Sequence, residues 1–176
     1  MRYEFLGYEN VDGSVGVRSK VLILPTVICV NDVVSKLTSL VNGTSTALHT
    51  CGCTQLGVDY EITYRTLLGT ALNPNIFSVL VVGLGCEKVR ANELANDIVR
   101  SGKWVEVLEV QEVGYEGVLE KGVSILKKMV SESSRRSRRS YDLSNLVVGL
   151  ECGGSDSTSS IAANPAVGYV SDKLVD

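Results

Sequence analysis

Four cysteines occupy similar places in the chain, each shortly after a run of apolar residues. They are Cys29, Cys53, Cys86 and Cys152. Thiolates bind soft metals and iron–sulfur clusters, and a cysteine beside a histidine can act as a nucleophile. Small buried cysteines are also common packing residues. The scattered spacing lacks the tight CxxC pairs of zinc modules, and no cysteine stands out as a nucleophile, so metal binding and packing are the leading interpretations.

Polar side chains that can exchange protons or bind ligands stand close to these cysteines. Asn31, His49 and Glu87 each lie within a few residues of one of them, and His49 is the only histidine in the chain. Gln111 and Glu112 follow a further apolar run. Cys51, the fifth cysteine, is left out of the candidate set.

Two further places suit the binding of an anion. Residues 151–160 form a polar, glycine-bearing segment in which backbone amides and the Ser155 hydroxyl could hold an anion. The alternative is an ordinary loop in which Ser155 or Asp156 caps a helix. Arg18 stands just before the first apolar run, where it could make a bidentate contact with a carboxylate or a surface salt bridge.

The elements that must position these residues alternate along the chain. Continuous runs rich in Val, Ile and Leu, without strict alternation, are typical of parallel strands covered on both faces. Segments with helical spacing lie between them. The expected strands are residues 21–30, 46–49, 77–84, 104–110 and 146–150, and the expected helices are residues 32–41, 58–72, 89–100 and 115–130.

This alternation predicts a doubly wound, mostly parallel five-stranded sheet with helices on both faces, of the flavodoxin or Rossmann type. Ligands of such sheets bind beyond the carboxyl ends of the strands. The cysteines and their polar neighbours would meet there. A final helix is expected from Pro165, with Asn164 as its N-cap.

The length and net charge of the chain limit the classes of protein to which it can belong. With 176 residues, 44% of them hydrophobic, we expect a single α/β domain over residues 1–176, with a leading segment at 1–18 and a sheet–helix core at 19–176. The net charge of −3 argues against nucleic acid or membrane partners, and the basic segment 131–140 is interpreted as a solvated loop. With no secretory signal or apolar run of about 20 residues, a cytoplasmic location is expected.

Eight motifs along the chain resemble those of the altronate and galactarate dehydratase family. They are DGSVGVR (12–18), LPTVICVN (24–31), HTCGCTQLG (49–57), NPN (73–75), GLGCE (83–87), ECGGSD (151–156), ANP (163–165) and SD (171–172). They are long, ordered and spread over nearly the whole chain. The chain resembles the altronate enzymes more than the galactarate enzymes, and the family also includes a sulfolactate sulfo-lyase.

The resemblance implies a metal-assisted hydro-lyase that converts a hydroxylated sugar acid to a 2-keto-3-deoxy acid. The proton alpha to the carboxylate leaves, and then the neighbouring hydroxyl. Ferrous iron is the expected cofactor, with Mn²⁺ or an iron–sulfur cluster as alternatives. The roles implied are these: catalysis by His49, Glu87 and Asp156; substrate binding by Arg18, Asn31, Gln55, Ser155 and Asn164; metal binding by Cys29, Cys53, Cys86 and Cys152.

The chain departs from the family pattern at several positions, and these departures suggest alternatives to an active dehydratase. Asn10 stands where an arginine usually precedes the Asp12–Gly13 pair, Ser19 replaces an asparagine and Ser160 a glycine. The family's C-terminal domain is expected to be absent, so the predicted partners are a sugar acid, that domain or a partner subunit, and a second copy of the chain. A ligand-binding module without turnover and an inactive domain fragment are the competing interpretations.

Replacing Cys29, Cys86 and Cys152 with serine tests the thiol ligands. If these thiols hold iron, the triple variant loses most of its iron and acid-labile sulfide, because serine is a poor ligand for soft metals. Elemental analysis and a sulfide assay of anaerobically purified protein measure the loss, and Cys51→Ser is the control. Unchanged iron in the triple variant would remove the thiols from the ligand set.

Overall fold

The chain is described here by a computed structural model that covers residues 3–151 and 153–175. Where the sequence suggested one domain over residues 1–176, the contacts divide the chain into two compact units. The larger unit is Leu6–Ser140; the smaller one combines Met1–Phe5 with Tyr141–Asp176.

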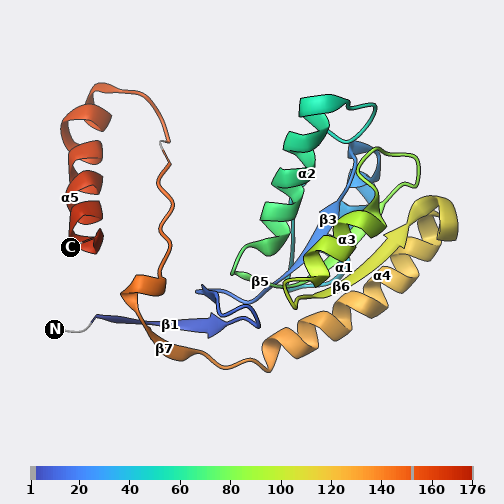
Figure 1. The fold of residues 1–176 in the computed structure, drawn as a ribbon, viewed down its shortest axis with the longest axis horizontal. Helices are drawn as coiled ribbons and strands as arrows, with labels where there is room; N and C mark the ends of the chain where they lie inside the picture. The colour runs from blue at the N-terminus through green and yellow to red at the C-terminus, as the bar shows by residue number, and fades with distance from the viewer. Residues whose placement is uncertain (1–2, 152, 176) are drawn as a thin grey trace. The chain divides into compact units, whose positions relative to one another are not determined.

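A four-stranded parallel sheet forms the centre of the larger unit (Figure 1). Every neighbouring pair in it is parallel, and β3 and β5 pair along their whole common length. The continuous apolar run of β3 fits this central position, because both of its faces are buried. In spatial order the strands are β4 (Thr44–Thr46), β3 (Lys20–Pro25), β5 (Ile76–Gly83) and β6 (Trp104–Glu109).

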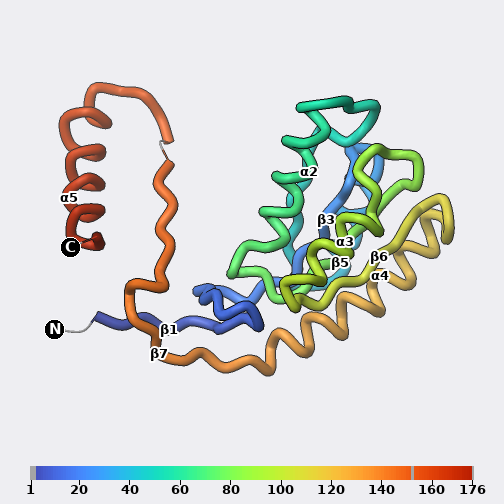
Figure 2. Tube along the Cα trace, in the orientation of Figure 1, coloured from blue at the N-terminus to red at the C-terminus, as the bar shows by residue number. Residues whose placement is uncertain are grey.

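Helices cover both faces of this sheet. α1 and α4 pack on one face and α2 and α3 on the other, and Figure 2 shows the crossovers that connect successive strands. α4 contains a break at Gly114, whose φ of 74° is outside the helical range, so the long helix begins with a short separate turn. The helices are α1 (Asn31–Leu40), α2 (Gly57–Leu72), α3 (Ala91–Val99) and α4 (Val110–Ser134).

The two hydrophobic cores follow from the alternation of side chains along the strands. Val21 and Ile23 of β3 belong to the core beneath α1 and α4, whereas Leu22 and Leu24 belong to the core beneath α2 and α3. Leu80 of β5 is fully buried in the first core. Each face of the sheet therefore has a hydrophobic core of its own.

Most of the predicted elements are present, with one clear exception. The first four predicted strands and the helix predicted after each of them all occur, with shifted ends. The predicted fifth strand at residues 146–150 is not a strand, and Val147 there is 89% exposed. Its apolar run resembles a buried strand only in composition. The segment 131–140 is also not wholly a loop, because its first four residues extend α4 and its last two begin β7 (Arg139–Asp142).

A second, three-stranded sheet combines two strands that precede the parallel sheet in the chain with one that follows it. β1 (Glu4–Glu9) pairs with β2 (Val15–Gly16), and the sheet order is β2-β1-β7. The boundary between the two units passes through β1 and β7. Gly16 allows a very close approach, since a Cβ there would lie 2.2 Å from the Pro74 carbonyl oxygen.

The smaller unit ends in a helix that begins earlier than the sequence suggested. The elements are η2 (Leu143–Asn145), the π-helical turn η3 (Ser159–Ala163) and α5 (Asn164–Val175). The prediction of Asn164 as N-cap is wrong, because its backbone is already helical. Asp156 is the capping residue: its Oδ1 accepts hydrogen bonds from the Thr158 and Ser159 amides at 2.7 and 2.9 Å.

None of the helices in the described parts of the chain combines the length and apolarity needed to cross a membrane.

The buried core predicts a measurable difference between two leucines. Leu80→Ala lowers the free energy of unfolding by about 2–5 kcal/mol, because it leaves a cavity in the closed core. Leu40→Ala, the same change at a side chain that is 49% exposed, costs less than about 1 kcal/mol. Urea denaturation of both variants measures these values, and equal losses would show that Leu80 does not lie in a packed core.

Candidate functional site

The strand order reverses between β3 and β5, since β4 lies beyond one of them and β6 beyond the other. Connections that leave these two strands run to opposite faces of the sheet, which opens a crevice at their carboxyl ends. Three loops surround it: residues 26–30, 47–56 and 84–90. We call these loops, together with Asn31 at the start of α1, the rim.

A buried carboxylate ties two of the rim loops together. Glu87 is 4% exposed, and its Oε1 accepts a hydrogen bond from the Thr26 hydroxyl at 2.7 Å. The same carboxylate accepts from the Leu84 amide at 3.0 Å and from the Gly85 amide at 2.6 Å. The bond to Thr26 joins the loop after β5 to the loop after β3.

The hydrogen bonds decide the protonation state of Glu87. Burial alone would raise its pKa, but the bonds from Thr26 and from the backbone amides outweigh that effect and lower the pKa. Glu87 is therefore an anion that only accepts hydrogen bonds at neutral pH. Its donors all come from the protein, which fits a bracing role better than the predicted role in catalysis.

The loop after β4 packs directly onto the end of β3. The Ile28 amide donates to the Cys51 carbonyl at 3.0 Å. Gly52 has a φ of 102°, and a Cβ there would lie 2.3 Å from the Thr26 carbonyl oxygen, so only glycine fits. The Gly52 amide donates to Gln55 Oε1 at 3.0 Å. The predicted ligand Gln55 thus helps to shape this loop.

His49 is held by both of its ring nitrogens. Nε2 lies 2.9 Å from the Pro25 carbonyl oxygen, and Nδ1 accepts from the Cys51 amide at 3.2 Å. A carbonyl oxygen can only accept, so Nε2 carries the proton and Nδ1 the lone pair in the neutral ring. The structure therefore presents one tautomer of His49 at the rim.

Asn31 lies beside His49 and has an unused acceptor. Its Nδ2 donates to the His49 carbonyl at 2.9 Å. Its Oδ1 is buried and has no hydrogen-bond partner within the described part of the chain. A buried acceptor without a partner costs free energy, so a ligand that donates a hydrogen bond would be stabilised there.

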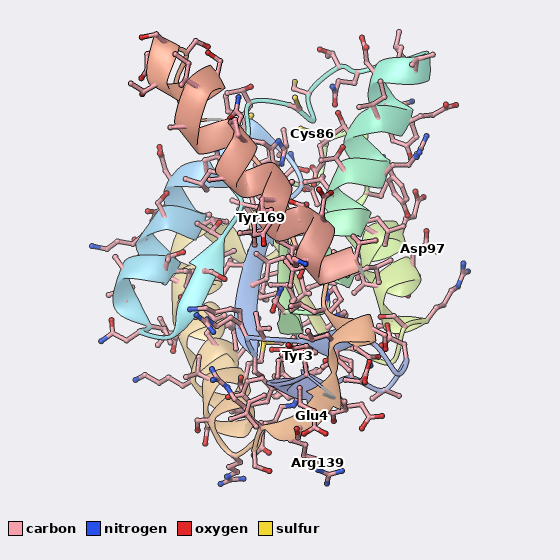
Figure 3. The ribbon with its side chains drawn as sticks, turned by 90° about the vertical axis from the view of Figure 1, so that its left-hand side faces the viewer. Tyr3, Glu4, Cys86, Asp97, Arg139 and Tyr169 are labelled. Atoms are coloured by element: carbon pink, nitrogen blue, oxygen red, sulfur yellow. The ribbon has the colours of Figure 1, made fainter. Side chains whose placement is uncertain are left out.

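The cysteines are less well grouped than their positions in the sequence suggested. Cys29, Cys51, Cys53 and Cys86 are free and exposed, and Figure 3 shows Cys86 on the loop that leaves β5. Among residues 3–151 and 153–175, no group of three or more His, Cys, Asp or Glu side chains is placed to hold a metal ion. Cys152 lies outside the described residues. Metal binding by these thiols stays a prediction.

Glu109 is a titratable group that the sequence analysis missed. Burial raises its pKa, and the nearby charges of Glu112 and Glu87 raise it further. It is the last residue of β6, and the Asn92 amide donates to it at 3.4 Å. Its position at the end of the fourth apolar run was the available signal.

The remaining predicted residues belong to other segments than the rim loops. Arg18 precedes β3, so the six residues of that strand, about 20 Å in length, separate it from the loops at the other end. Ser155, Asp156 and Asn164 belong to the smaller unit, where they line a pocket of about 370 Å³. Bonds from Thr158 and Ser159 lower the pKa of Asp156, consistent with its capping role.

Two family models match the chain. Residues 7–134 match the model described as D-galactarate dehydratase/altronate hydrolase, second domain. Residues 143–176 match the one described as D-galactarate/altronate dehydratase, C-terminal. The division of the chain after Ser140 falls in the short gap between the two matches. Part of the C-terminal domain, which the sequence analysis expected to be absent, is therefore represented.

Relatives match over almost the whole chain. An altronate dehydratase of Bacillus subtilis is 40% identical over 184 residues, which cover 97% of this chain and 36% of the relative. A galactarate dehydratase (L-threo-forming) of Escherichia coli is 36% identical, with 98% and 37% covered. A (2R)-sulfolactate sulfo-lyase subunit beta of Chromohalobacter salexigens is 34% identical, with 98% and 44% covered. The chain spans less than half the length of these relatives.

The bonds to Glu87 predict a pH-dependent loss of stability. Glu87→Gln lowers the free energy of unfolding at pH 7 by about 1–3 kcal/mol, because the amide group turns one acceptor into a donor that faces a backbone N–H. The lowered pKa stabilises the fold fully above the ordinary value of 4.5, and this contribution disappears as pH falls through the folded-state pKa.

The difference between wild type and Glu87→Gln should therefore shrink below about pH 4.5. Urea denaturation at several pH values measures it, and Glu120→Gln, at an exposed position on α4, is the control. A difference that is constant between neutral and acid pH would contradict the ionised brace.

Proposed function

Because this chain belongs to the D-galactarate dehydratase/altronate hydrolase family, we propose that it supplies part of the active site of a sugar-acid dehydratase. The family match over residues 7–134, which includes the whole rim, supports this most strongly. The dehydratase relatives are hydro-lyases by name, and their resemblance extends over nearly all of this chain. The activity is proposed for the whole protein, of which these residues provide one ligand-binding edge.

The reaction removes the proton alpha to a carboxylate and expels the neighbouring hydroxyl as water, after which the enol becomes a 2-keto-3-deoxy acid. It requires a base for the proton, an acid for the departing hydroxyl and hydrogen bonds that orient the substrate. His49 is proposed to take the alpha proton and to return it to the departing hydroxyl, which leaves as water, and Asn31 and Gln55 are proposed to orient the substrate.

His49 is suited to proton transfer by its fixed tautomer. Nε2 is bonded to the Pro25 carbonyl, so Nδ1 carries the lone pair. Its bond to the Cys51 amide, at 3.2 Å, is the longer of the two. A substrate that displaces the Cys51 amide would place its alpha C–H opposite the lone pair of Nδ1, which can then accept the proton.

Asn31 and Gln55 are proposed to orient the hydroxyl groups of the substrate. Asn31 Oδ1 offers a buried acceptor next to His49. Gln55 uses its Oε1 within the loop, which leaves its Nε2 group as a donor. A polyhydroxylated acid presents both donors and acceptors, so it can satisfy both side chains at once.

The expected ferrous iron does not fit a preformed site in the described residues. No three of their His, Cys, Asp or Glu side chains form a ligand set, so no step is assigned to the metal. Ligation by Cys29, Cys53, Cys86 and Cys152 stays a proposal, and such a site would need donors beyond those that the structure brings together.

A sulfo-lyase reaction is the second candidate. The relative named (2R)-sulfolactate sulfo-lyase subunit beta matches 98% of this chain, the same share as the galactarate dehydratase. Removal of a proton beside a carboxylate followed by loss of sulfite would use the same rim, with a different leaving group.

Activity assays separate these functions. The native polypeptide that contains these residues, purified anaerobically and supplied with ferrous iron, should release a keto acid from altronate or galactarate. Sulfite release from sulfolactate would favour the second candidate. Absence of turnover with all three acids would refute the proposed function.

His49→Gln provides the sharpest test of the chemistry. We expect kcat to fall by about 10²–10⁴-fold, because glutamine cannot exchange a proton near neutral pH. The pH profile should lose the limb that reports the imidazole. Thr50→Ala, at the exposed neighbouring position, is the control. Full activity of His49→Gln would exclude His49 from the mechanism.

A further inference from the structure

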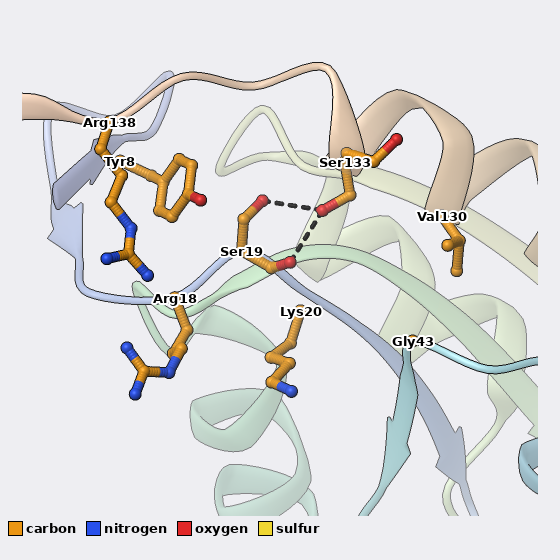
Figure 4. A pocket seen from close by; sticks show the side chains of 9 residues that line it. Tyr8, Arg18, Ser19, Lys20, Gly43, Val130, Ser133 and Arg138 are labelled. Carbon is orange, nitrogen blue, oxygen red and sulfur yellow. Dashed lines mark hydrogen bonds between the residues drawn. The ribbon is translucent and has the colours of Figure 1, made fainter.

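We propose that a second site, at the amino ends of the strands, binds a small oxyanion such as a carboxylate or phosphate. The site is a pocket of about 300 Å³ in the larger unit, shown in Figure 4. Its lining comes from β1, the segment before β3, the end of α4 and the chain that follows α4. We call it the amino-edge pocket; Tyr8, Arg18, Ser19, Lys20, Gly43, Val130, Ser133, Ser134 and Arg138 line it.

Three cations line this pocket without a balancing carboxylate. They are Arg18, Lys20 and Arg138, which come from two separate parts of the sequence. Within residues 3–151 and 153–175, none of the three forms an ion pair with an acidic side chain. Like charges that share a pocket repel one another, so a bound anion would lower the energy of all three.

The serine hydroxyls stabilise the wall of the pocket and leave the cations free. Ser133 Oγ donates to the Ser19 carbonyl at 2.7 Å, and the two hydroxyls lie 2.9 Å apart. Ser134 Oγ donates to the Ser131 carbonyl at 2.7 Å. Because these serine protons are used within the protein, the donors left to bind an anion are the Lys20 ammonium, the Tyr8 hydroxyl and the two guanidinium groups, of which Arg18 also donates from one nitrogen to the Val17 carbonyl at 3.2 Å.

The arginine-bearing segment is held in place by aromatic rings. Arg136 lies over the Phe77 ring at 5.1 Å and donates to Ser19 Oγ at 3.1 Å and to the Glu9 carbonyl. Arg138 lies over the Tyr8 ring at 5.4 Å. A guanidinium group already ordered on a ring loses less conformational entropy when it binds an anion.

The size and chemistry of the pocket limit its ligand. A volume near the lower end of ligand pockets suits a small molecule. Guanidinium groups match the planar carboxylate and the tetrahedral phosphate equally well, and both present several acceptor oxygens. The ligand class is therefore a small oxyanion that carries a carboxylate or a phosphate group.

This site is distinct from the rim, because Arg18 and Lys20 stand at the opposite end of β3 from Thr26. It does not depend on the proposed dehydratase function. A loss of turnover in a His49 variant would therefore not contradict anion binding in the amino-edge pocket. A loss of anion binding would likewise not contradict the role proposed for the rim.

Calorimetric titration of the 176-residue chain tests the proposal. Inorganic phosphate and galactarate are added in separate experiments at constant ionic strength, with chloride as the reference anion. Saturable binding of at least one of the two oxyanions is expected, and their relative affinities distinguish a phosphate site from a carboxylate site. Absence of saturable binding for both would overturn the proposal.

Matched variants locate the bound anion. Arg18→Ala and Arg138→Ala should each weaken binding by about tenfold or more, since each removes a charge-assisted hydrogen bond. Arg65→Ala, an exposed arginine on α2, should leave the affinity unchanged. Lys20→Gln gives a third, exposed test position if an arginine variant fails to fold. Equal weakening by Arg65→Ala, or no weakening by the pocket variants, would show that the anion binds elsewhere.

Discussion

The rim depends on one buried carboxylate. Glu87 accepts from the Thr26 hydroxyl and from two backbone amides, and so joins the loops that leave the two central strands. Since the strand order reverses between those strands, the loops would otherwise diverge around an open crevice. The ionised state of Glu87, maintained by its donors, fixes the edge on which His49 and Asn31 are presented.

Much of the fold follows from the sequence, and the exceptions have physical causes. The continuous apolar runs of β3 and β5 and the helical spacing between strands predict a parallel sheet covered on both faces, and this is confirmed. Residues 146–150 have the same composition but are not a strand, because a short apolar run does not reveal which surface will cover it. Asp156, one of two capping residues considered, caps the final helix, and the choice of Asn164 is wrong.

The site was only partly predictable. His49, Asn31 and Glu87 each lie at or just after the end of a predicted parallel strand. Because the carboxyl ends of parallel strands lie at one edge of a sheet, the sequence predicts that these residues meet there. Their roles could not be derived in the same way. Glu87 is a brace because it accepts hydrogen bonds both from amides of its own loop and from Thr26, in the loop after β3. Arg18, which the sequence grouped with the substrate ligands, lies at the other end of β3. Three cations, Arg18, Lys20 and Arg138, therefore line a pocket at the amino edge, although the net charge of −3 suggests no such cluster.

The three rim loops are proposed to form one ligand site for a sugar acid. Titration of the 176-residue chain with altronate, followed in a two-dimensional amide NMR spectrum, tests it most directly. The amide signals that move should belong to the rim residues 26–31, 47–56 and 84–90. Movement confined to other residues, with the rim signals unchanged at saturation, would contradict it.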